Sequence, residues 1–197
     1  MAHLQPLDID LHSQLKPEFD RYAKTLGFVP NSVLIMQRKP KIVKALAQLS
    51  AAVFDAESGT VELGFKRLIA HMASRASGCQ YCMAHNAGLA LHLGIEPVKF
   101  EAVWEYSTSP LYTEAERVAL DFALAAASVP NAVDDALFSC MQTYWSDDQI
   151  VEITGVISYF GFMNRWNDTM ATPLEQEPQE VGEKYLSSQG WSTGKHV

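Results

Sequence analysis

Apolar residues recur at helical spacing through most of this chain. In the segment 39–58 they stand at 42, 43, 46, 49, 53 and 54, which is the period of one helix face and not the alternation of a strand. Helices are also predicted over 13–28, 61–76, 79–94, 96–107, 113–129, 131–145 and 147–170. No β-hairpin signal appears between them, so the sequence predicts an all-α helical bundle.

Local signals predict several helix ends. Thr113 with Glu116, and Ser146 with Gln149, have the spacing of capping boxes. Gly94 is placed to end its helix as a C′ glycine.

Two further features concern packing and domain organisation. Gly155 and Gly161, inside the long segment 147–170, predict close helix–helix packing. From about residue 173 the sequence is polar, contains two prolines and has no period. We therefore expect a single domain over 1–172, with its functional core at about 61–94, and a polar C-terminal arm or tail over 173–197.

Charge and hydropathy exclude some partners. The net charge is −8 and no cluster of five Lys or Arg occurs, which argues against nucleic acid or an anionic membrane surface as a partner. There is no run of 18 apolar residues, and the first residues lack the basic start and apolar stretch of a signal peptide. The expected location is the cytoplasm, with no membrane span.

The chain has three cysteines, which is too few for a disulfide framework. Two of them, Cys79 and Cys82, form a Cys-x-x-Cys, and such a pair in a reducing compartment is typically catalytic or metal-binding. Cys140 stands alone in the apolar stretch "LFSCMQTYW", where we expect a buried small hydrophobic side chain.

The spacing of "GCQYCMAH" places two thiols and an imidazole on one helix. At about 100° per residue, Cys79 and Cys82 share a face and His85 lies one turn beyond Cys82. With Ser77 as the predicted N-cap, both cysteines fall near the helix start, where unpaired N–H groups and the helix dipole favour a thiolate. His85 could then accept a thiol proton.

Other interpretations of these residues stay open. A zinc site needs three or four ligands around the ion, whereas Cys79, Cys82 and His85 lie too close in direction on one helical turn, so we expect neither metal nor cofactor. The pair could also be two inert buried thiols. His71 and His92 are interpreted as packing or surface residues, and Tyr81 as a packing residue whose hydroxyl could help to close a pocket.

The segment 65–95, "FKRLIAHMASRASGCQYCMAHNAGLALHLGI", resembles the carboxymuconolactone decarboxylase and alkylhydroperoxidase D superfamily, in its peroxidase-related branch. The shared core is a helix, then Gly-Cys-x-Tyr-Cys, then a histidine, and the resemblance extends from about 25 to 172. It implies an all-helical fold that assembles into homo-oligomers. It also implies thiol-dependent peroxidase activity, with Cys79 and Cys82 as the redox pair.

The chain departs from the family pattern at two positions. The family histidine usually falls four residues after the second cysteine, where this chain has Asn86; His85 is one residue earlier. At the family's proton-relay glutamate this chain has Arg67, and Glu62 is the nearest upstream acid. A cation there could stabilise a thiolate directly.

The leading hypothesis is a thiol peroxidase or disulfide reductase acting on a small hydroperoxide. One thiolate would attack the O–O bond, the other would condense with the resulting sulfenic acid, and a dithiol partner would reduce the disulfide. The helix dipole is strongest nearest the helix end and favours Cys79 as the attacking thiol, whereas proximity to His85 favours Cys82. Of the two, we expect Cys82 to attack and Cys79 to resolve. Two alternatives are a non-redox carboxymuconolactone decarboxylase-like enzyme that uses His85, and a binding protein that uses the pair as a redox sensor.

Overall fold

A computed structural model describes residues 2–197 of the chain, and within that range it contains ten α-helices and no strand. They are α1 (Lys16–Leu26), α2 (Asn31–Met36), α3 (Pro40–Val53), α4 (Leu63–Ala76), α5 (Gln80–His92), α6 (Pro97–Glu101), α7 (Glu114–Ala127), α8 (Asp135–Tyr144), α9 (Asp147–Met170) and α10 (Gln176–Tyr185). The all-α prediction is confirmed. The sequence interpretation missed α2, because it treated the residues around Pro30 as a plain turn. No helix in residues 2–197 has the length and apolar character needed to cross a membrane.

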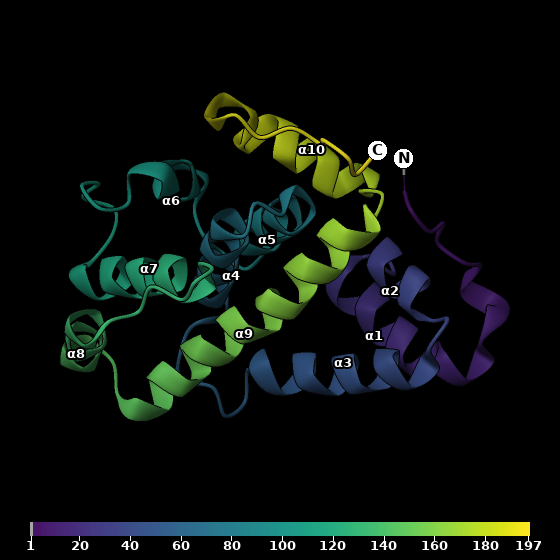
Figure 1. The fold of residues 1–197 in the computed structure, drawn as a ribbon, viewed down its shortest axis with the longest axis horizontal. Coiled ribbons are helices and arrows are strands. Elements are labelled where there is room, and N and C mark those ends of the chain that lie inside the picture. Colours follow the sequence, from purple (N-terminus) through teal and green to yellow (C-terminus); the bar gives the residue numbers. More distant parts are fainter. Residues whose placement is uncertain (1) are drawn as a thin grey trace.

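The long helix α9 organises the molecule. In Figure 1 it runs diagonally, with α1, α2 and α3 on one side and α4 to α8 on the other. Helices α4 and α5 pack against each other, and α9 contacts both of them. Nearly every side chain of α4 is buried, so this helix forms the centre of the core.

The predicted helix ends are largely confirmed. Both capping boxes form, with Thr113 and Ser146 as the N-caps. Gly94 takes the positive φ expected after a helix.

The packing role predicted for the two glycines of α9 is wrong at Gly161. A Cβ built on Gly155 would meet Val53 of α3 at 3.8 Å, an ordinary contact. A Cβ on Gly161 would have no neighbour within 4 Å, because this face of α9 is open in the described chain.

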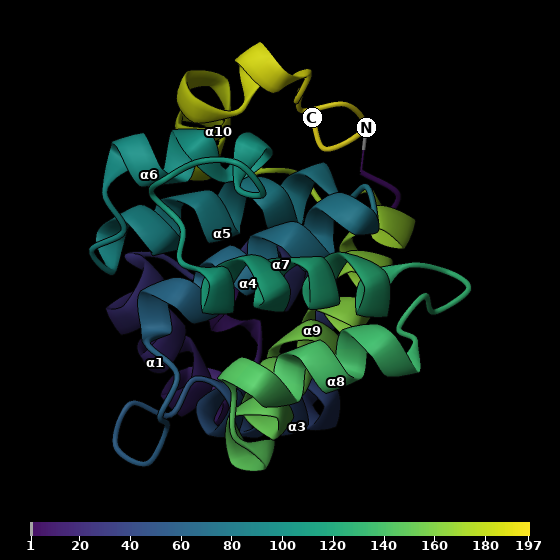
Figure 2. The same cartoon turned by 90° about the vertical axis from the view of Figure 1, so that its left-hand side faces the viewer.

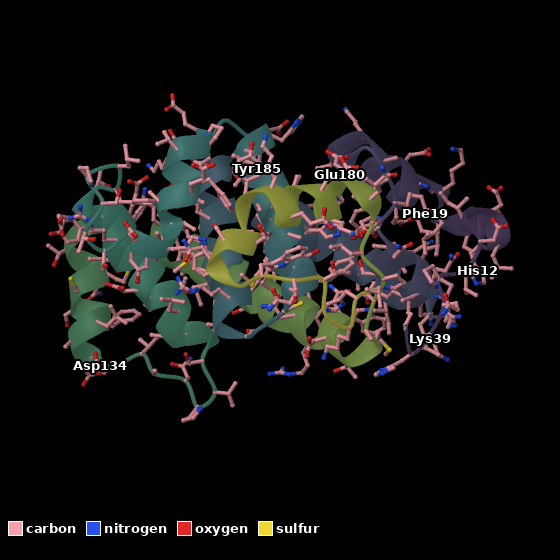
Figure 3. All side chains as sticks on the ribbon, turned by 90° about the horizontal axis from the view of Figure 1, so that it is seen from above. His12, Phe19, Lys39, Asp134, Glu180 and Tyr185 are labelled. Carbon is pink, nitrogen blue, oxygen red and sulfur yellow. The ribbon has the colours of Figure 1, made fainter. Side chains whose placement is uncertain are left out.

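The C-terminal segment is not an irregular tail. It forms α10, which lies on α5, as Figure 2 shows from the side and Figure 3 from above. The Trp191 indole N–H donates to the Gln80 carbonyl over 3.0 Å, which ties the segment to the start of α5. A Cβ on Gly182 would overlap the Trp191 ring, so the close packing depends on that glycine. Trp191 therefore packs against its own chain.

Cys140 also differs from its prediction. The thiol is exposed on α8, whereas the adjacent Met141 is buried. Successive residues of a helix point about 100° apart, so only one of the two can face the core.

Candidate active site

The turn between α4 and α5 places the two neighbouring cysteines. Gly78 has φ of +72°, which reverses the chain after α4, and the Cys79 N–H donates to the Ser74 carbonyl over 3.0 Å. Cys79 is itself the N-cap of α5, and Cys82 lies in the first turn. The predicted N-cap, Ser77, instead ends α4. Both thiols are free, and they are 0% and 2% exposed.

A cavity of about 190 Å³ reaches Cys82 but not Cys79. Its walls come from α1, α2, α3, α4, α5 and α9, and most of them are apolar or aromatic. Polar groups enter at a few points, notably His85, Tyr81 and Arg67. A mainly apolar cavity with a few convergent polar groups is typical of a small-molecule site.

The Cys82 sulfur is subject to opposing influences. Burial raises the pKa of the Cys82 thiol well above its usual value, and a hydrogen bond with Cys79 raises it further. The Asn167 side-chain N–H donates to Sγ over 3.3 Å and lowers the pKa. The Thr172 hydroxyl donates to the other end of the Asn167 amide over 2.9 Å, which fixes its orientation. Burial outweighs the stabilisation expected at a helix start, so the resting group is a thiol.

His85 is held by a carboxylate that the sequence interpretation did not find. His85 Nε2 lies 2.7 Å from Glu175 Oε2, and the Tyr81 hydroxyl donates to the same carboxylate over 2.9 Å. Burial opposes ionisation of Glu175, but the charge and hydrogen bond of His85, with hydrogen bonds from Asn31 and Tyr81, hold its pKa below the usual value. In the neutral form of His85, with Nε2–H donating to Glu175, the Nδ1 atom is left as an acceptor.

A carboxylate thus lies beside His85, although Arg67 stands at the family's glutamate position. Glu175 comes from the segment just before α10, not from α4. Glu62 is an exposed residue preceding α4 and does not line the cavity. The Asn86 side-chain N–H, at the usual histidine position, donates to the Cys82 carbonyl over 2.9 Å. The residue therefore supports α5, and its amide cannot act as a base.

A second group of polar side chains surrounds the other thiol. Ligand atoms of Cys79, Asp168 and His196 all lie within 4.8 Å of one another. His196 is 1% exposed, and its Nδ1 lies 2.8 Å from the Thr172 carbonyl, so Nδ1 carries the hydrogen. Its Nε2 has no hydrogen-bond partner among the described residues and lies 3.8 Å from Asp168. These atoms could serve a proton transfer or hold a metal ion.

The remaining histidines with helical positions lie outside the cavity. His71 is fully buried, its Nδ1 lies 3.1 Å from the Met83 carbonyl, and burial lowers its pKa to about 4. It packs edge-on against Phe100. His92 is exposed at the end of α5. Both were interpreted as packing or surface residues, and this is confirmed.

Comparisons with known proteins agree with this architecture. The family model described as "Carboxymuconolactone decarboxylase family" matches residues 40–125. The debrominase Bmp8 is 34% identical, with 92% of this chain and 96% of that chain covered and a TM-score of 0.86. A Bmp8 variant with one cysteine replaced by alanine, solved in complex with 2,3,4-tribromopyrrole, is 33% identical over the same shares of the two chains, also with a TM-score of 0.86. The chain therefore belongs to the carboxymuconolactone decarboxylase and alkylhydroperoxidase D-like superfamily.

Two further relatives are more distant. An uncharacterised peroxidase-related protein from Ralstonia eutropha JMP134, with an alkylhydroperoxidase AhpD core, is 22% identical over 88% of this chain and 94% of its own, with a TM-score of 0.73, and shares the fold. The uncharacterised protein YnjA of Escherichia coli K12 is 29% identical over 97 residues. That match spans 49% of this chain and 53% of YnjA, so the chain spans about half the length of this curated relative.

Proposed function

We propose that this chain is a dithiol-dependent reductase of a small organic electrophile, in which Cys82 attacks and Cys79 resolves. One observation carries the proposal: Cys82 lies in the wall of the cavity, and Cys79 is its hydrogen-bonded neighbour outside it. A substrate in the cavity can therefore meet only the first thiol of the pair. The second thiol is placed to attack the Cys82 sulfur after the substrate has reacted.

His85 is the candidate base for Cys82. It lines the same cavity, its neutral form offers Nδ1 as an acceptor, and Glu175 can stabilise the imidazolium that forms. The raised pKa of Cys82 makes such a base necessary, because a buried neutral thiol is a poor nucleophile.

His196 is the corresponding candidate for Cys79. Its unpartnered Nε2 belongs to the group of atoms around the Cys79 sulfur. Accepting the Cys79 proton would produce the thiolate needed to close the disulfide.

The favoured substrate class is a halogenated aromatic compound. Support comes from the full-length similarity to a debrominase and from the size of the cavity. An engineered apolar cavity of about 150 Å³ binds benzene, so a cavity of about 190 Å³ is large enough for a substituted ring.

The thiol pair supplies the electrons for this reaction. The Cys82 thiolate attacks bromine, the C–Br bond breaks, and its electron pair goes to the ring carbon, which takes a proton. The Cys79 thiolate then attacks the Cys82 sulfur, forming the disulfide and releasing bromide. The sum is one aryl bromide and two thiols giving one arene, one disulfide, one bromide and one proton. A dithiol donor restores the pair by exchange.

A hydroperoxide is the second candidate, because the same pair could reduce an O–O bond. Cys82 would become a sulfenic acid with release of an alcohol, and Cys79 would then form the disulfide with release of water. The Gly-Cys-x-Tyr-Cys core shared with the alkylhydroperoxidases supports this substrate.

The test uses the Cys140→Ser protein, reduced and freed of metal with a chelator, so that only the buried pair is counted. One equivalent of 2,4,6-tribromophenol, or of cumene hydroperoxide, is added, and bromide, free thiols and tryptic disulfides are measured. The expected result is one bromide released for each Cys79–Cys82 disulfide formed. If the thiols stay unmodified with both compounds, the dithiol mechanism is wrong. A disulfide formed only with the hydroperoxide would select the second candidate.

A further inference from the structure

Arg67 is a buried cation without an anion. It lies in the middle of α4, is 9% exposed, and stacks over the Phe54 ring with its guanidinium carbon 3.7 Å from the ring centre. Among residues 2–197 no carboxylate lies within ion-pair distance of it. Within this range its guanidinium donates one hydrogen bond, to the Asn86 side-chain oxygen over 3.5 Å, and its Nε has no partner. Burial lowers the pKa of Arg67 to about 10, so the group is still charged at neutral pH.

A buried guanidinium without an anion lowers the stability of the folded chain when no ligand is bound. Charged groups that are removed from water are normally paired, because an uncompensated buried charge lowers stability. Lys66, the adjacent residue, follows that rule: it is buried and its amino group lies 2.9 Å from Glu152. The missing partner of Arg67 therefore needs a separate explanation.

The cavity supplies one. Arg67 lines it together with Cys82, and no aspartate or glutamate is among its lining residues. The Tyr22 hydroxyl, also in the lining, is buried and has no hydrogen-bond partner in the part of the chain that the structure describes. The second lining arginine, Arg21, already donates to the Ala47 carbonyl over 2.8 Å. The cavity thus offers a cation and a hydroxyl donor, with aromatic walls, and no negative charge.

We infer that the cavity binds an anionic aromatic compound, whose ionised oxygen pairs with the Arg67 guanidinium while its ring lies against Cys82. This inference rests on the proposed function, since it names the substrate class of that site. It narrows the halogenated aromatics to those that carry an ionised oxygen, such as a bromophenolate. The ligand would provide the counter-charge that the folded chain lacks.

Binding measured without turnover tests this inference. The protein carries Cys82→Ser, so that no electron transfer occurs, and the probes are 2,4,6-tribromophenol and its methyl ether, 2,4,6-tribromoanisole. The two probes share ring and bromines, but only the phenol can ionise. Affinities are measured by tryptophan fluorescence at pH values below and above the ionisation of the phenol.

The phenolate is expected to bind at least about 10-fold more tightly than the ether, because a charge-assisted hydrogen bond is gained. Arg67→Met should remove this preference, so that the phenolate and the ether bind with equal affinity. Arg75→Met is the matched control: it removes an arginine of the same helix that packs on Trp104 outside the cavity, and the preference should persist. Methionine fills similar space without a charge, so the Arg67 variant should fold, which circular dichroism would verify.

Equal binding of phenol and ether, or a preference that survives Arg67→Met, would overturn the inference. The activity of the unaltered Cys82 protein separates this from a failure of the proposed function. Phenolate binding through Arg67 without bromide release would keep the anion site and reject the reductase. Bromide release from the ether as fast as from the phenol would keep the reductase and reject the anion site.

Discussion

Burial and a single hydrogen bond have opposite effects on the pKa of the Cys82 thiol, and so on its reactivity. Burial and Cys79 raise the pKa of the thiol, and the Asn167 amide opposes them from α9. A donor aimed at sulfur stabilises the thiolate more than the thiol. Asn167 therefore favours the Cys82 thiolate directly, and its own amide is oriented by Thr172.

Replacing Asn167 with leucine tests this role. The variant keeps the volume but removes the donor, so the pKa of Cys82 should rise further and alkylation at pH 7 should slow by roughly 10-fold. The measurement is the rate of iodoacetamide modification of Cys82 against pH in a Cys140→Ser background. An unchanged pH profile would show that Asn167 has no electrostatic influence on the thiol.

Sequence alone could predict only the part of the site that one helix carries. Cys79, Cys82 and His85 fall within two turns, so their spacing brings them together in any helical fold. Asn167 and Glu175 lie 85 and 90 residues from their partners, and helix packing decides those contacts. A buried asparagine or glutamate has no spacing pattern that would reveal it in advance.

At the scale of elements, the C-terminal segment is the part that the sequence interpretation described least well. Its helix α10 contains Pro178 and Gly182, both of which have low helix propensity, so no clear period appeared. The missing signal is tertiary, because the segment is held by packing on α5. It contributes Glu175 and His196, one for each cysteine of the pair.

His196→Gln should slow the closing of the disulfide while leaving the first attack by Cys82 intact. Burial lowers the pKa of His196, although Thr172 and Asp168 oppose this, so the imidazole is neutral at pH 7 and can accept a proton. After one equivalent of cumene hydroperoxide, Cys82 sulfenic acid should persist about 10²-fold longer and become trappable by dimedone.

The matched control for that experiment is His3→Gln. His3 is exposed and contacts the end of α9 through the Thr169 carbonyl, at 2.8 Å. It does not belong to the group formed by Cys79, Asp168 and His196. Its sulfenic acid should disappear at the rate of the parent protein. Equal lifetimes of the sulfenic acid in both variants would show that His196 takes no part in closing the disulfide.

The contact between α4 and α9 includes the ion pair of Lys66 and Glu152. Burial opposes the charge of Glu152, but hydrogen bonds from Lys66, Thr60 and Val61 lower its pKa from 4.5 to about 2. Glu152→Gln would leave Lys66 buried without an anion and should cost about 2–3 kcal/mol of unfolding free energy at pH 7. Urea unfolding measures this, with the exposed Glu180→Gln as control.

The sign of the pH dependence follows from the lowered pKa. Glu152 is more acidic in the folded protein, so its stabilisation is complete above about pH 4.5 and is lost as pH falls towards 2. The difference between the parent and Glu152→Gln should therefore shrink over that range. A difference that stays constant down to pH 2 would contradict the assignment of the pair.

At the scale of the whole molecule, assembly into homo-oligomers stays a prediction. The face of α9 around Gly161 is open, and Phe162 beside it is a large apolar side chain exposed to solvent. If copies of the chain meet there, Phe162→Glu should reduce the molar mass in light scattering to that of one chain, because a buried carboxylate is unfavourable. Phe138→Glu on α8 is the control for an exposed apolar residue elsewhere. A parent protein that already elutes as one chain would contradict the prediction.

The contrast between one exposed and two buried thiols also affects how such a protein would be noticed in a cell. A survey of cysteine reactivity with a bulky maleimide would label Cys140, which faces solvent on α8, and would miss the pair beneath the C-terminal segment. The strongest labelling would then be at Cys140, which takes no part in the proposed reaction. A small probe that enters the cavity is the reagent that would report Cys82.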